Sequence, residues 1–263
     1  MKIEIFQIDA FAKKLFSGNP AAVCVLSEWL SDELMQHIAE ENNLAETAFI
    51  LAKEGRYEIR WFTPVVEVDL CGHATLASAY TLFEFFETDA SSIEFFSPRS
   101  GILHVFKEGD ILFLDFPTDP IEPVAGIPEI EQGIGKKPME VYKGKTDYVA
   151  VLETEAEVKS VEPNFLRIAT LPARGLIVTA KGDTVDFVSR FFAPQSGVNE
   201  DHVTGSAHTS LIPLWASKLG KDKLSALQLS KRGGMLTCEY NGERCYIGGG
   251  AKLYLKGEVY VEE

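Results

Sequence analysis

The sequence predicts a strand-rich α+β fold built from two similar domains that arose by internal duplication. Two stretches, RWFTPVVEVDLCGHATLASA (60–79) and RFFAPQSGVNEDHVTGSAH (190–208), both begin Arg-aromatic-Phe-x-Pro and run through acidic residues to a glycine. A segment that holds four of the twelve prolines, FPTDPIEPVAGIPEIE, separates them. A repeat of about 130 residues is too long for a solenoid, so we expect two similar domains related by a pseudo-twofold axis.

The two copies differ in the length of the segment just before the glycine that begins each predicted helix. From Phe62 to Gly72 is ten positions, whereas from Phe192 to Gly205 is thirteen. The second copy therefore has a longer loop, in a place where functional variation usually occurs. We divide the chain at the proline-rich segment into an N-terminal domain, residues 1–117, and a C-terminal domain, residues 118–263. The final strand of the chain is also able to pack onto the N-terminal domain.

Most segments alternate polar and apolar residues, which indicates strands. In the first half we predict strands over KIEIFQIDAF, after the turn at Gly18-Asn19-Pro20, over ETAFILAK, RYEIRWF and SIEFF, and in a hairpin that turns near Gly109-Asp110. In the second half the predicted strands are GLIVTAK, VDFVSRFF, a hairpin that turns at Asn241-Gly242, and KLYLKGEVYVEE. A short amphipathic helix is predicted over SDELMQHIAEEN, with Ser31 as its N-cap.

Two segments break the alternation and predict buried helices. GHATLASAYTLFEFF and GSAHTSLIPLWASKL carry small or apolar residues around nearly their whole circumference. A helix without a polar face is buried in the core. Each segment begins at a glycine followed by Ser, His or Thr, which suits a helix start. We expect Pro213 to kink the second helix.

Composition and charge narrow the functional classes. The 263 residues are 46% hydrophobic and 24% charged, as in ordinary soluble globular proteins. The formal net charge of −14 disfavours nucleic acids and anionic membrane surfaces as partners, although a helix N-terminus can still bind a small anion. The N-terminus lacks the apolar core of a signal peptide, and no run of about 18 apolar residues exists. We therefore expect no membrane contact and a cytoplasmic location.

The two predicted helix starts, at Gly72 and Gly205, are candidate anion sites. The first turn of a helix has backbone N–H groups without intrahelical partners, and the helix dipole adds to their attraction for anions. If the two domains face a common cleft, these groups suit a carboxylate, or an enolate that forms from one. The alternative is a pair of buried helices that hydroxyl groups cap and whose glycines permit close packing.

Three titratable residues near these helix starts are candidates for proton transfer. Glu46 lies in NLAETAF among apolar or small residues, where desolvation would raise its pKa toward that of a general base. His73 follows Gly72, and Asp201 precedes the second helix start, so the two could form a proton relay with Glu46. The alternatives are a glutamate at a strand edge facing water and a histidine that only caps a helix.

The spacing of the cysteines indicates neither a disulfide framework nor a zinc site. One of the thiols, that of Cys71, lies next to a predicted helix start. The four cysteines show no CxxC spacing and are expected to be reduced thiols: Cys24, Cys71, Cys238 and Cys245. A thiol one residue from a helix N-terminus has a depressed pKa and could act as a nucleophile or acid/base. The second copy offers no cysteine near Gly205, which excludes a racemase with two thiols. Cys71 is therefore expected to be a small buried residue.

Four motifs, GNPAAV, NLAETAF, FTPVVEVDLCGHAT and EDHVTGSAH, occur in an order and at spacings that resemble the phenazine-biosynthesis (PhzF-like) isomerase family. Each motif alone is weak, but together they span nearly the whole chain. The family has the diaminopimelate-epimerase-like fold. The resemblance implies that each domain is a curved, mostly antiparallel sheet (a half-barrel) around a central helix, with the active site in the cleft between the two domains.

The resemblance also implies a site and a chemistry. The residues that match the family's site are Asn19 near the site, Glu46 as the catalytic glutamate, Gly72 and His73 as its Gly-His pair, Asp201 as its acidic residue, and Gly205 and Ser206 as the pair whose backbone receives the substrate carboxylate. The implied reaction needs no cofactor and no metal: the glutamate removes a proton from carbon, and a proton returns elsewhere. Related epimerases use two cysteines; Cys71 matches the first, and His202 takes the place of the second. The family also suggests a homodimer.

One position departs from the family pattern. The family usually has Glu-Asp-Pro-Val before TGSAH, whereas this chain has Glu200-Asp201-His202-Val203. Loss of the proline is expected to loosen the loop that positions Asp201, and it adds a titratable group. The predicted function is an isomerase that acts on a small carboxylic acid. The alternatives are an epimerase or racemase that uses Cys71 and a non-catalytic carboxylate-binding protein.

Overall fold

The computed structural model describes residues 1–262 and shows two compact units. The first unit consists of Met1–Asp115 together with the segment from Gly248 onward, and the second consists of Phe116–Ile247. Two strands, β8 (Ile111–Pro117) and β17 (Arg244–Gly249), carry the chain from one unit into the other. Among the described residues, no helix has the length and apolar character needed to cross a bilayer.

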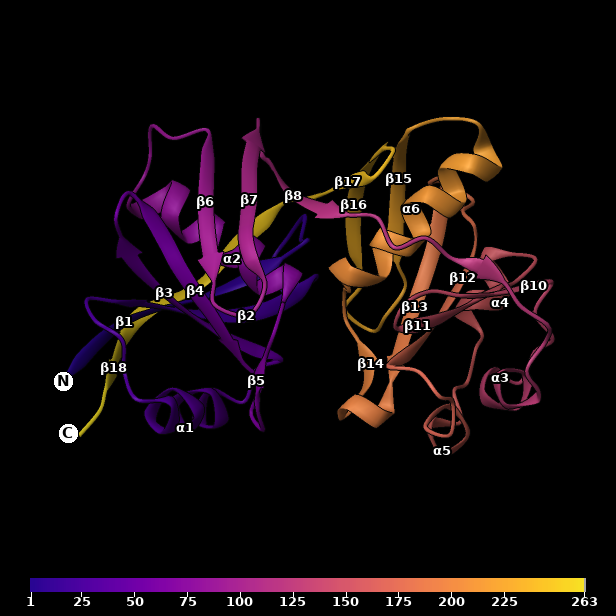
Figure 1. Ribbon diagram of the computed structural model, residues 1–263, viewed down its shortest axis with the longest axis horizontal. Helices are drawn as coiled ribbons and strands as arrows, with labels where there is room; N and C mark the ends of the chain where they lie inside the picture. Colours follow the sequence, from indigo (N-terminus) through magenta and orange to yellow (C-terminus); the bar gives the residue numbers. More distant parts are fainter. Residues whose placement is uncertain (263) are drawn as a thin grey trace. The chain divides into compact units, whose positions relative to one another are not determined.

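The first unit is built mainly of strands, as predicted. Its remaining elements are β1 (Lys2–Ala10), β2 (Asn19–Leu26), α1 (Asp32–Asn42), β3 (Glu46–Lys53), β4 (Arg56–Phe62), β5 (Glu67–Val68), α2 (Gly72–Phe85), β6 (Ser92–Ser97), β7 (Gly101–Glu108) and β18 (Ala251–Tyr260) (Figure 1). The predicted strands of this half are confirmed, and so is the short helix. Ser31 caps α1 because its hydroxyl accepts the Leu34 N–H at 3.2 Å.

The second unit contains more short elements than the sequence predicts. They are β9 (Glu122–Pro123), α3 (Pro128–Ile134), β10 (Glu140–Lys143), β11 (Asp147–Val151), α4 (Glu155–Lys159), α5 (Phe165–Ile168), β12 (Gly175–Lys181), β13 (Phe187–Ala193), the 3-10 turn η1 (Pro194–Ser196), β14 (Val198–Asp201), α6 (Gly205–Leu219), β15 (Lys223–Gln228) and β16 (Gly234–Asn241). The prediction misses the strands β9, β10, β11, β14 and β15 and the short helices α3, α4 and α5. Every residue of β11 is buried, so this strand lacks the alternation on which the prediction depends.

The same strand topology occurs in both units, which confirms the internal duplication. In the first unit β1 pairs antiparallel with β2, β2 parallel with β3, β3 antiparallel with β4, β4 parallel with β6, and β6 antiparallel with β7. In the second unit β10, β11, β12, β13, β15 and β16 repeat these pairings in the same order. The short strands β5 and β14 pair with β4 and β13 at equivalent places. The fold is therefore α+β with two similar, mostly antiparallel units.

Each unit surrounds one long buried helix. The residues of α2 are buried on nearly every side, and the helix packs against β1, β2 and β3. The equivalent helix α6 packs against β15 and β16 and is also largely buried. Both helices occur where the sequence predicts them, beginning at Gly72 and Gly205. Pro213 lies inside α6, which continues from Gly205 to Leu219.

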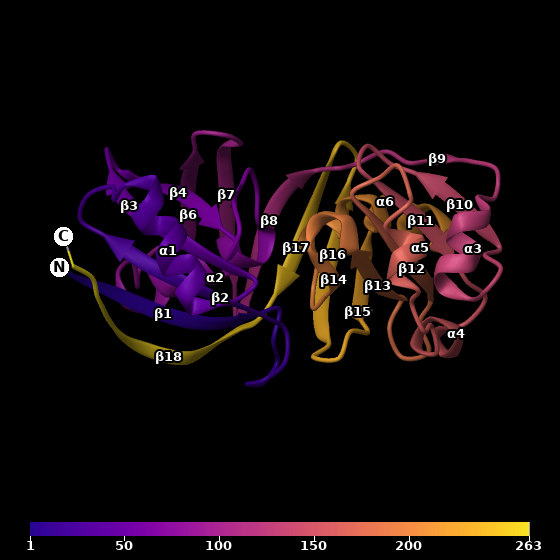
Figure 2. The ribbon, with the colours of Figure 1, turned by 90° about the horizontal axis from the view of Figure 1, so that it is seen from below.

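The last strand belongs to the first unit. β18 pairs antiparallel with β1 from Lys2 opposite Tyr260 to Ala10 opposite Ala251, and the two strands run side by side in Figure 2. The Val261 N–H also donates to the Met1 carbonyl at 3.1 Å. The sequence prediction counts this strand in residues 118–263 and allows it to pack on the first domain, and the pairing with β1 gives the physical reason for that packing.

The duplicated Arg-aromatic-Phe-x-Pro motif forms the same contact in each unit. In the first copy Arg60 donates from Nε and Nη2 to the two carboxylate oxygens of Glu67 at 2.7 and 2.9 Å. In the second copy Arg190 donates in the same way to Glu200 at 2.7 and 3.1 Å. Each guanidinium also lies over the ring of the phenylalanine two residues later. The motif thus joins a long strand to the loop that leads into the buried helix.

Candidate functional site

Asn19 reaches the interior of the first unit because of the tight turn before it. Gly18 has φ +72°, and a Cβ at this position would lie 2.1 Å from the Ala10 carbonyl oxygen, so only glycine fits the turn. Asn19 then begins β2 as a fully buried residue. Its Nδ2 lies 3.1 Å from Nδ1 of His73. The GNP motif therefore supplies a buried amide that orients the histidine.

Glu46 and His73 contact each other at the start of β3 and the start of α2. The Glu46 Oε2 atom lies 3.0 Å from Nε2 of His73, and the Glu46 side chain is 17% exposed. In the neutral ring the Asn19 amide can donate only to an unprotonated Nδ1, which places the ring proton on Nε2, the nitrogen that faces Glu46. Glu46 is neither isolated in the core nor at an edge facing bulk water; its side chain is partly exposed and its carboxylate lies against a buried imidazole.

The protonated form of His73 is favoured at this position. Burial lowers the pKa of the ring, but the neighbouring Cys71 sulfur and the Glu46 carboxylate raise it by more. The pKa of His73 therefore lies well above its ordinary value. A cationic imidazole beside Glu46 is suited to stabilising negative charge that develops next to it.

Cys71 is the N-cap residue of α2 and is buried, as predicted. Its Sγ lies 3.5 Å from Nδ1 of His73. The depressed thiol pKa expected at a helix start is wrong, because burial and the Glu46 carboxylate raise the pKa of Cys71. The thiol therefore favours its neutral form, which is a weak nucleophile and base.

Three potential ligand atoms meet in this cluster. A carboxylate oxygen of Glu46, the Cys71 sulfur and a ring nitrogen of His73 lie within 4.8 Å of one another. Such a set of donors can hold a divalent cation, but only with a thiolate and a neutral imidazole. Without a cation, the raised pKa values of Cys71 and His73 favour the protonated form of each.

The second unit holds Asp201 in a short hydrogen-bonded loop before α6. The Thr204 hydroxyl donates to Oδ2 of Asp201 at 2.6 Å. The buried Gln228 side chain accepts the Thr204 N–H at 2.8 Å and donates to the Asp201 carbonyl at 3.0 Å. The carbonyl of His202, where the family has proline, accepts the Ser230 hydroxyl at 2.7 Å. Side chains of β15 and of the turn after it thus hold this loop in place, although the absence of the proline predicts a looser loop.

Gly205 and Ser206 begin α6, and an arginine contacts the serine. Nη1 of Arg174 donates to the Ser206 hydroxyl at 3.0 Å. The same guanidinium makes an ion pair with Asp147, a buried carboxylate at the start of β11. The sequence prediction includes Gly205 and Ser206 but neither Arg174 nor Gln228. Arg174 lies in an ordinary strand lead-in, PARGLIV, and Gln228 at a strand end, so neither carries a motif that could mark it.

Neither helix start is capped by a hydroxyl group. The N-cap residues are Cys71 for α2 and Thr204 for α6, and neither of these two side chains makes a cap hydrogen bond. The Thr204 hydroxyl donates to Asp201 instead. The alternative interpretation of two hydroxyl-capped helices is therefore wrong, and the first-turn N–H groups are not satisfied by a capping side chain.

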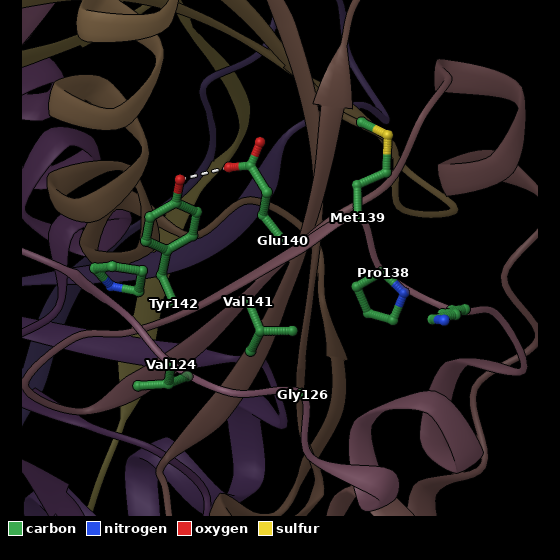
Figure 3. Close-up of a pocket in the computed structure, with 9 residues that line it drawn as sticks. Val124, Gly126, Pro138, Met139, Glu140, Val141 and Tyr142 are labelled. Carbon is green, nitrogen blue, oxygen red and sulfur yellow. Dashed lines mark hydrogen bonds between the residues drawn. The ribbon is translucent and has the colours of Figure 1, made fainter.

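A surface pocket of about 370 Å³ lies elsewhere on the second unit. Figure 3 shows Tyr142 directed toward Glu140, to which its hydroxyl donates. None of the predicted site residues lines this pocket, whose lining consists of Pro123, Val124, Gly126, Lys137, Pro138, Met139, Glu140, Val141 and Tyr142. The predicted site residues therefore lie outside this pocket.

Known proteins resemble this chain over almost its whole length. A Pseudomonas aeruginosa protein described as an uncharacterized isomerase is 52% identical over 261 residues, covering 99% of this chain and 100% of the relative. The crystal structure of an Enterococcus faecalis protein of the PhzF phenazine biosynthesis family is 48% identical, with a TM-score of 0.96 and coverage of 99% and 100%. A hydroxyproline epimerase from Agrobacterium vitis, solved with trans-4-hydroxy-L-proline, shares the fold alone, at 8% identity, a TM-score of 0.62 and coverage of 98% and 91%.

The family match extends through both units. The model of the family described as "Phenazine biosynthesis-like protein" matches residues 8–257. This range includes the buried amide, the glutamate, both helix starts and the loop before α6. With this match and the duplicated topology, the chain belongs to the phenazine biosynthesis-like, or PhzC-PhzF, family.

Proposed function

We propose that this protein is an isomerase that moves a proton between carbons of a small carboxylic acid without a cofactor. The single observation that carries this proposal is the 3.0 Å contact between Glu46 and His73 beside an uncapped helix start. A partly exposed carboxylate beside a buried imidazole can meet a substrate carbon and take its proton. The description of the Pseudomonas aeruginosa relative as an uncharacterized isomerase supports the same class.

Glu46 is the proposed general base and then the general acid. It removes a proton from a carbon next to the substrate carboxylate, which leaves an enolate-like anion. His73, whose pKa is raised and whose Nε2 lies 3.0 Å from Oε2 of Glu46, stabilises the negative charge that appears beside it. The partly exposed Glu46 carboxyl group exchanges its proton with water and then protonates a different carbon, so the double bond moves and no redox partner is needed.

The remaining predicted residues are proposed to bind the substrate. Backbone N–H groups at Gly72, Gly205 and Ser206 are candidates to receive the carboxylate, because no capping side chain occupies these helix starts. Asp201 is proposed to orient the substrate and assist proton transfer. Asn19 is proposed to act through His73, whose ring it holds.

Incubation with a panel of small carboxylic acids in heavy water tests the proposed function. An isomerase introduces deuterium at carbon and yields a product with a displaced double bond, and NMR spectroscopy detects both. A non-catalytic carboxylate-binding protein shows ligand binding without exchange of carbon-bound hydrogen. Exchange at one carbon with inversion and no shifted double bond would contradict the isomerase and favour an epimerase.

The second candidate function is an epimerase or racemase that uses Cys71. The observation in its favour is the Cys71 Sγ atom 3.5 Å from Nδ1 of His73, a base that could accept the thiol proton. Two observations weigh against it. The pKa of the thiol is raised, and the equivalent N-cap of α6 is Thr204. Glu46 is therefore preferred as the base.

A further inference from the structure

Arg174 and Glu46 occupy neighbouring positions of the duplicated fold. Glu46 begins β3 one residue before Thr47, which pairs with Phe62 of β4. Gly175 begins β12 one residue before Leu176, which pairs with Phe192 of β13. Gly175 is thus the counterpart of Glu46, and Arg174 comes directly before it.

Gly175 cannot carry a side chain in this structure. A Cβ at Gly175 would lie 2.5 Å from the ring of Phe191 and 2.9 Å from the carbonyl oxygen of Phe192. Contacts below 3.0 Å to a ring and to backbone require the strand pair to shift. The second unit therefore has no side chain at the position that holds the carboxylate in the first.

Arg174 makes the contact that Glu46 makes in the other copy. Glu46 touches His73, the second residue of α2, and Arg174 touches Ser206, the second residue of α6, both at 3.0 Å. The partners have opposite chemistry in the two copies: a carboxylate with an imidazole in one, a guanidinium with a hydroxyl in the other. The duplicated framework thus presents a base at one helix start and a cation at the other.

Several contacts fix the guanidinium. Arg174 donates from Nε to Oδ1 of Asp147 at 3.0 Å and also from Nη2 to Oδ2. It lies over the ring of Phe191 at 5.1 Å. The backbone N–H of Arg174 donates to the Thr146 carbonyl at 2.8 Å, which also fixes the start of this side chain.

The longer loop of the second copy supports the same segment. This loop includes η1, from which the Gln195 side chain donates to the Ala173 carbonyl at 2.6 Å. The extra residues seen in the sequence therefore hold the backbone that carries Arg174.

We propose that Arg174 is a positioning residue that holds the Ser206 hydroxyl as a donor toward the substrate carboxylate. The guanidinium donates to Oγ, which occupies one acceptor site of Ser206 and leaves its hydroxyl proton for a ligand. Three of the five guanidinium N–H groups donate to Asp147 and Ser206. The Arg174 side chain is also 36% exposed, so its positive charge acts on the ligand as well. This role rests on the proposed function, because it assumes that Ser206 receives a carboxylate.

Acetate titration followed by NMR of the backbone amides tests this role without knowledge of the substrate. Sodium acetate is added to the full-length protein at constant ionic strength, with acetamide as the neutral control. The wild type is expected to show saturable shifts of the Gly205 and Ser206 amides with acetate and none with acetamide. Arg174→Gln is expected to weaken the acetate response at least fivefold, and Arg174→Lys to restore part of it.

Two further variants separate positioning from folding. Ser206→Ala leaves the ion pair between Arg174 and Asp147 intact and is expected to weaken the acetate response as Arg174→Gln does. Arg167→Gln removes an exposed arginine of α5 in the same unit and is expected to titrate like the wild type. If Arg174→Gln does not fold, Ser206→Ala and Arg174→Lys carry the test.

The outcomes distinguish this role from the proposed function. A wild type without an acetate response, or a folded Arg174→Gln or Ser206→Ala with a wild-type response, overturns the role of Arg174. Glu46→Gln is expected to keep the full acetate response, because Glu46 is not part of the contact with Ser206. If the acetate pattern appears as expected but no acid exchanges carbon-bound hydrogen, the isomerase proposal fails and the role of Arg174 in carboxylate binding stands.

Discussion

Cys71 shows how burial reverses an expectation based on the helix dipole. A helix N-terminus lowers a thiol pKa when the thiol stays solvated, but Cys71 is buried and faces the Glu46 carboxylate, so its pKa rises. The sequence places the thiol correctly beside the helix start. It does not reveal that a carboxylate from β3 lies next to it, because Glu46 and Cys71 are 25 positions apart.

Cys71→Ala separates the two candidate bases. With Glu46 as the base, we expect the rate of deuterium incorporation to change less than about threefold, because the base is retained and its carboxylate still raises the pKa of His73. Cys24→Ala is the matched control, since Cys24 is another buried thiol of the first unit with a raised pKa. A fall of about a hundredfold or more in Cys71→Ala alone would assign the proton transfer to the thiol.

His208 predicts a measurable pH dependence of stability. Its ring is fully buried in α6, Nδ1 donates to the Thr204 carbonyl at 2.8 Å, and Nε2 has no hydrogen-bond partner among the described residues. Burial lowers the pKa of His208 to about 4. The unfolded chain, with a histidine pKa of about 6.5, then binds a proton that the folded chain does not. Stability is therefore lost as the pH falls from about 6.5 toward 4.

Comparison of the wild type with His208→Asn measures this loss. We expect the free energy of unfolding of the wild type to fall by about 3 kcal/mol more than that of the variant between pH 7 and pH 4. Asparagine retains a donor near the Nδ1 position. His73, whose raised pKa contributes stability below about 6.5 that is lost as the pH rises, is present in both proteins and cancels. Equal pH profiles in urea denaturation would show that His208 is not buried as a neutral ring.

At the scale of elements, the two arginine clamps explain why the chain repeats one motif. Arg60 with Glu67 and Arg190 with Glu200 each join a strand to the loop before a buried helix. Forked contacts of this kind need a guanidinium, since lysine offers one point charge. The sequence reveals the repeat but not the pairing, because the acidic partner lies seven residues beyond the arginine in one copy and ten in the other.

Replacement of Arg190 by lysine tests the clamp. Arg190→Lys loses the forked pair of hydrogen bonds to the Glu200 carboxylate and the Nη1 contacts with the Val158 and Val161 carbonyls, and we expect the free energy of unfolding to fall by about 2 kcal/mol in chemical denaturation. Arg60→Lys is expected to act in the same direction. The control is Lys223→Met, because the Lys223–Glu239 pair is exposed and contributes less than about 0.5 kcal/mol. An unchanged stability in Arg190→Lys would show that the repeated motif does not hold the loop.

Elements with a strong pattern could be predicted, and elements without one could not. β1 and β4 alternate, and α2 and α6 have no polar face, so local sequence identifies them. β11 is buried throughout, and α4 and α5 are too short to show a helical period. Their existence depends on the parallel pairing of β11 with β12, which is a tertiary property.

At the scale of the whole molecule, duplication followed by divergence accounts for the candidate site. The two units share their topology, but the strand start that carries Glu46 in one carries Gly175, preceded by Arg174, in the other. The four motifs identify the family and most candidate residues. They omit Arg174 and Gln228, because a residue that acts through a neighbour in space has no fixed spacing in the sequence. Substrate-lining side chains outside the motifs are hidden for the same reason.

The central claim is that Glu46 moves the substrate proton, and the most direct test is the rate of deuterium incorporation by Glu46→Gln on the first acid that the wild type isomerises. Glu41→Gln, which removes an exposed carboxylate from the end of α1, is the matched control. We expect the rate of Glu46→Gln to fall by about a hundredfold to ten-thousandfold, with circular dichroism and the acetate response unchanged and Glu41→Gln at the wild-type rate. A folded Glu46→Gln protein that incorporates deuterium at the wild-type rate would contradict the claim.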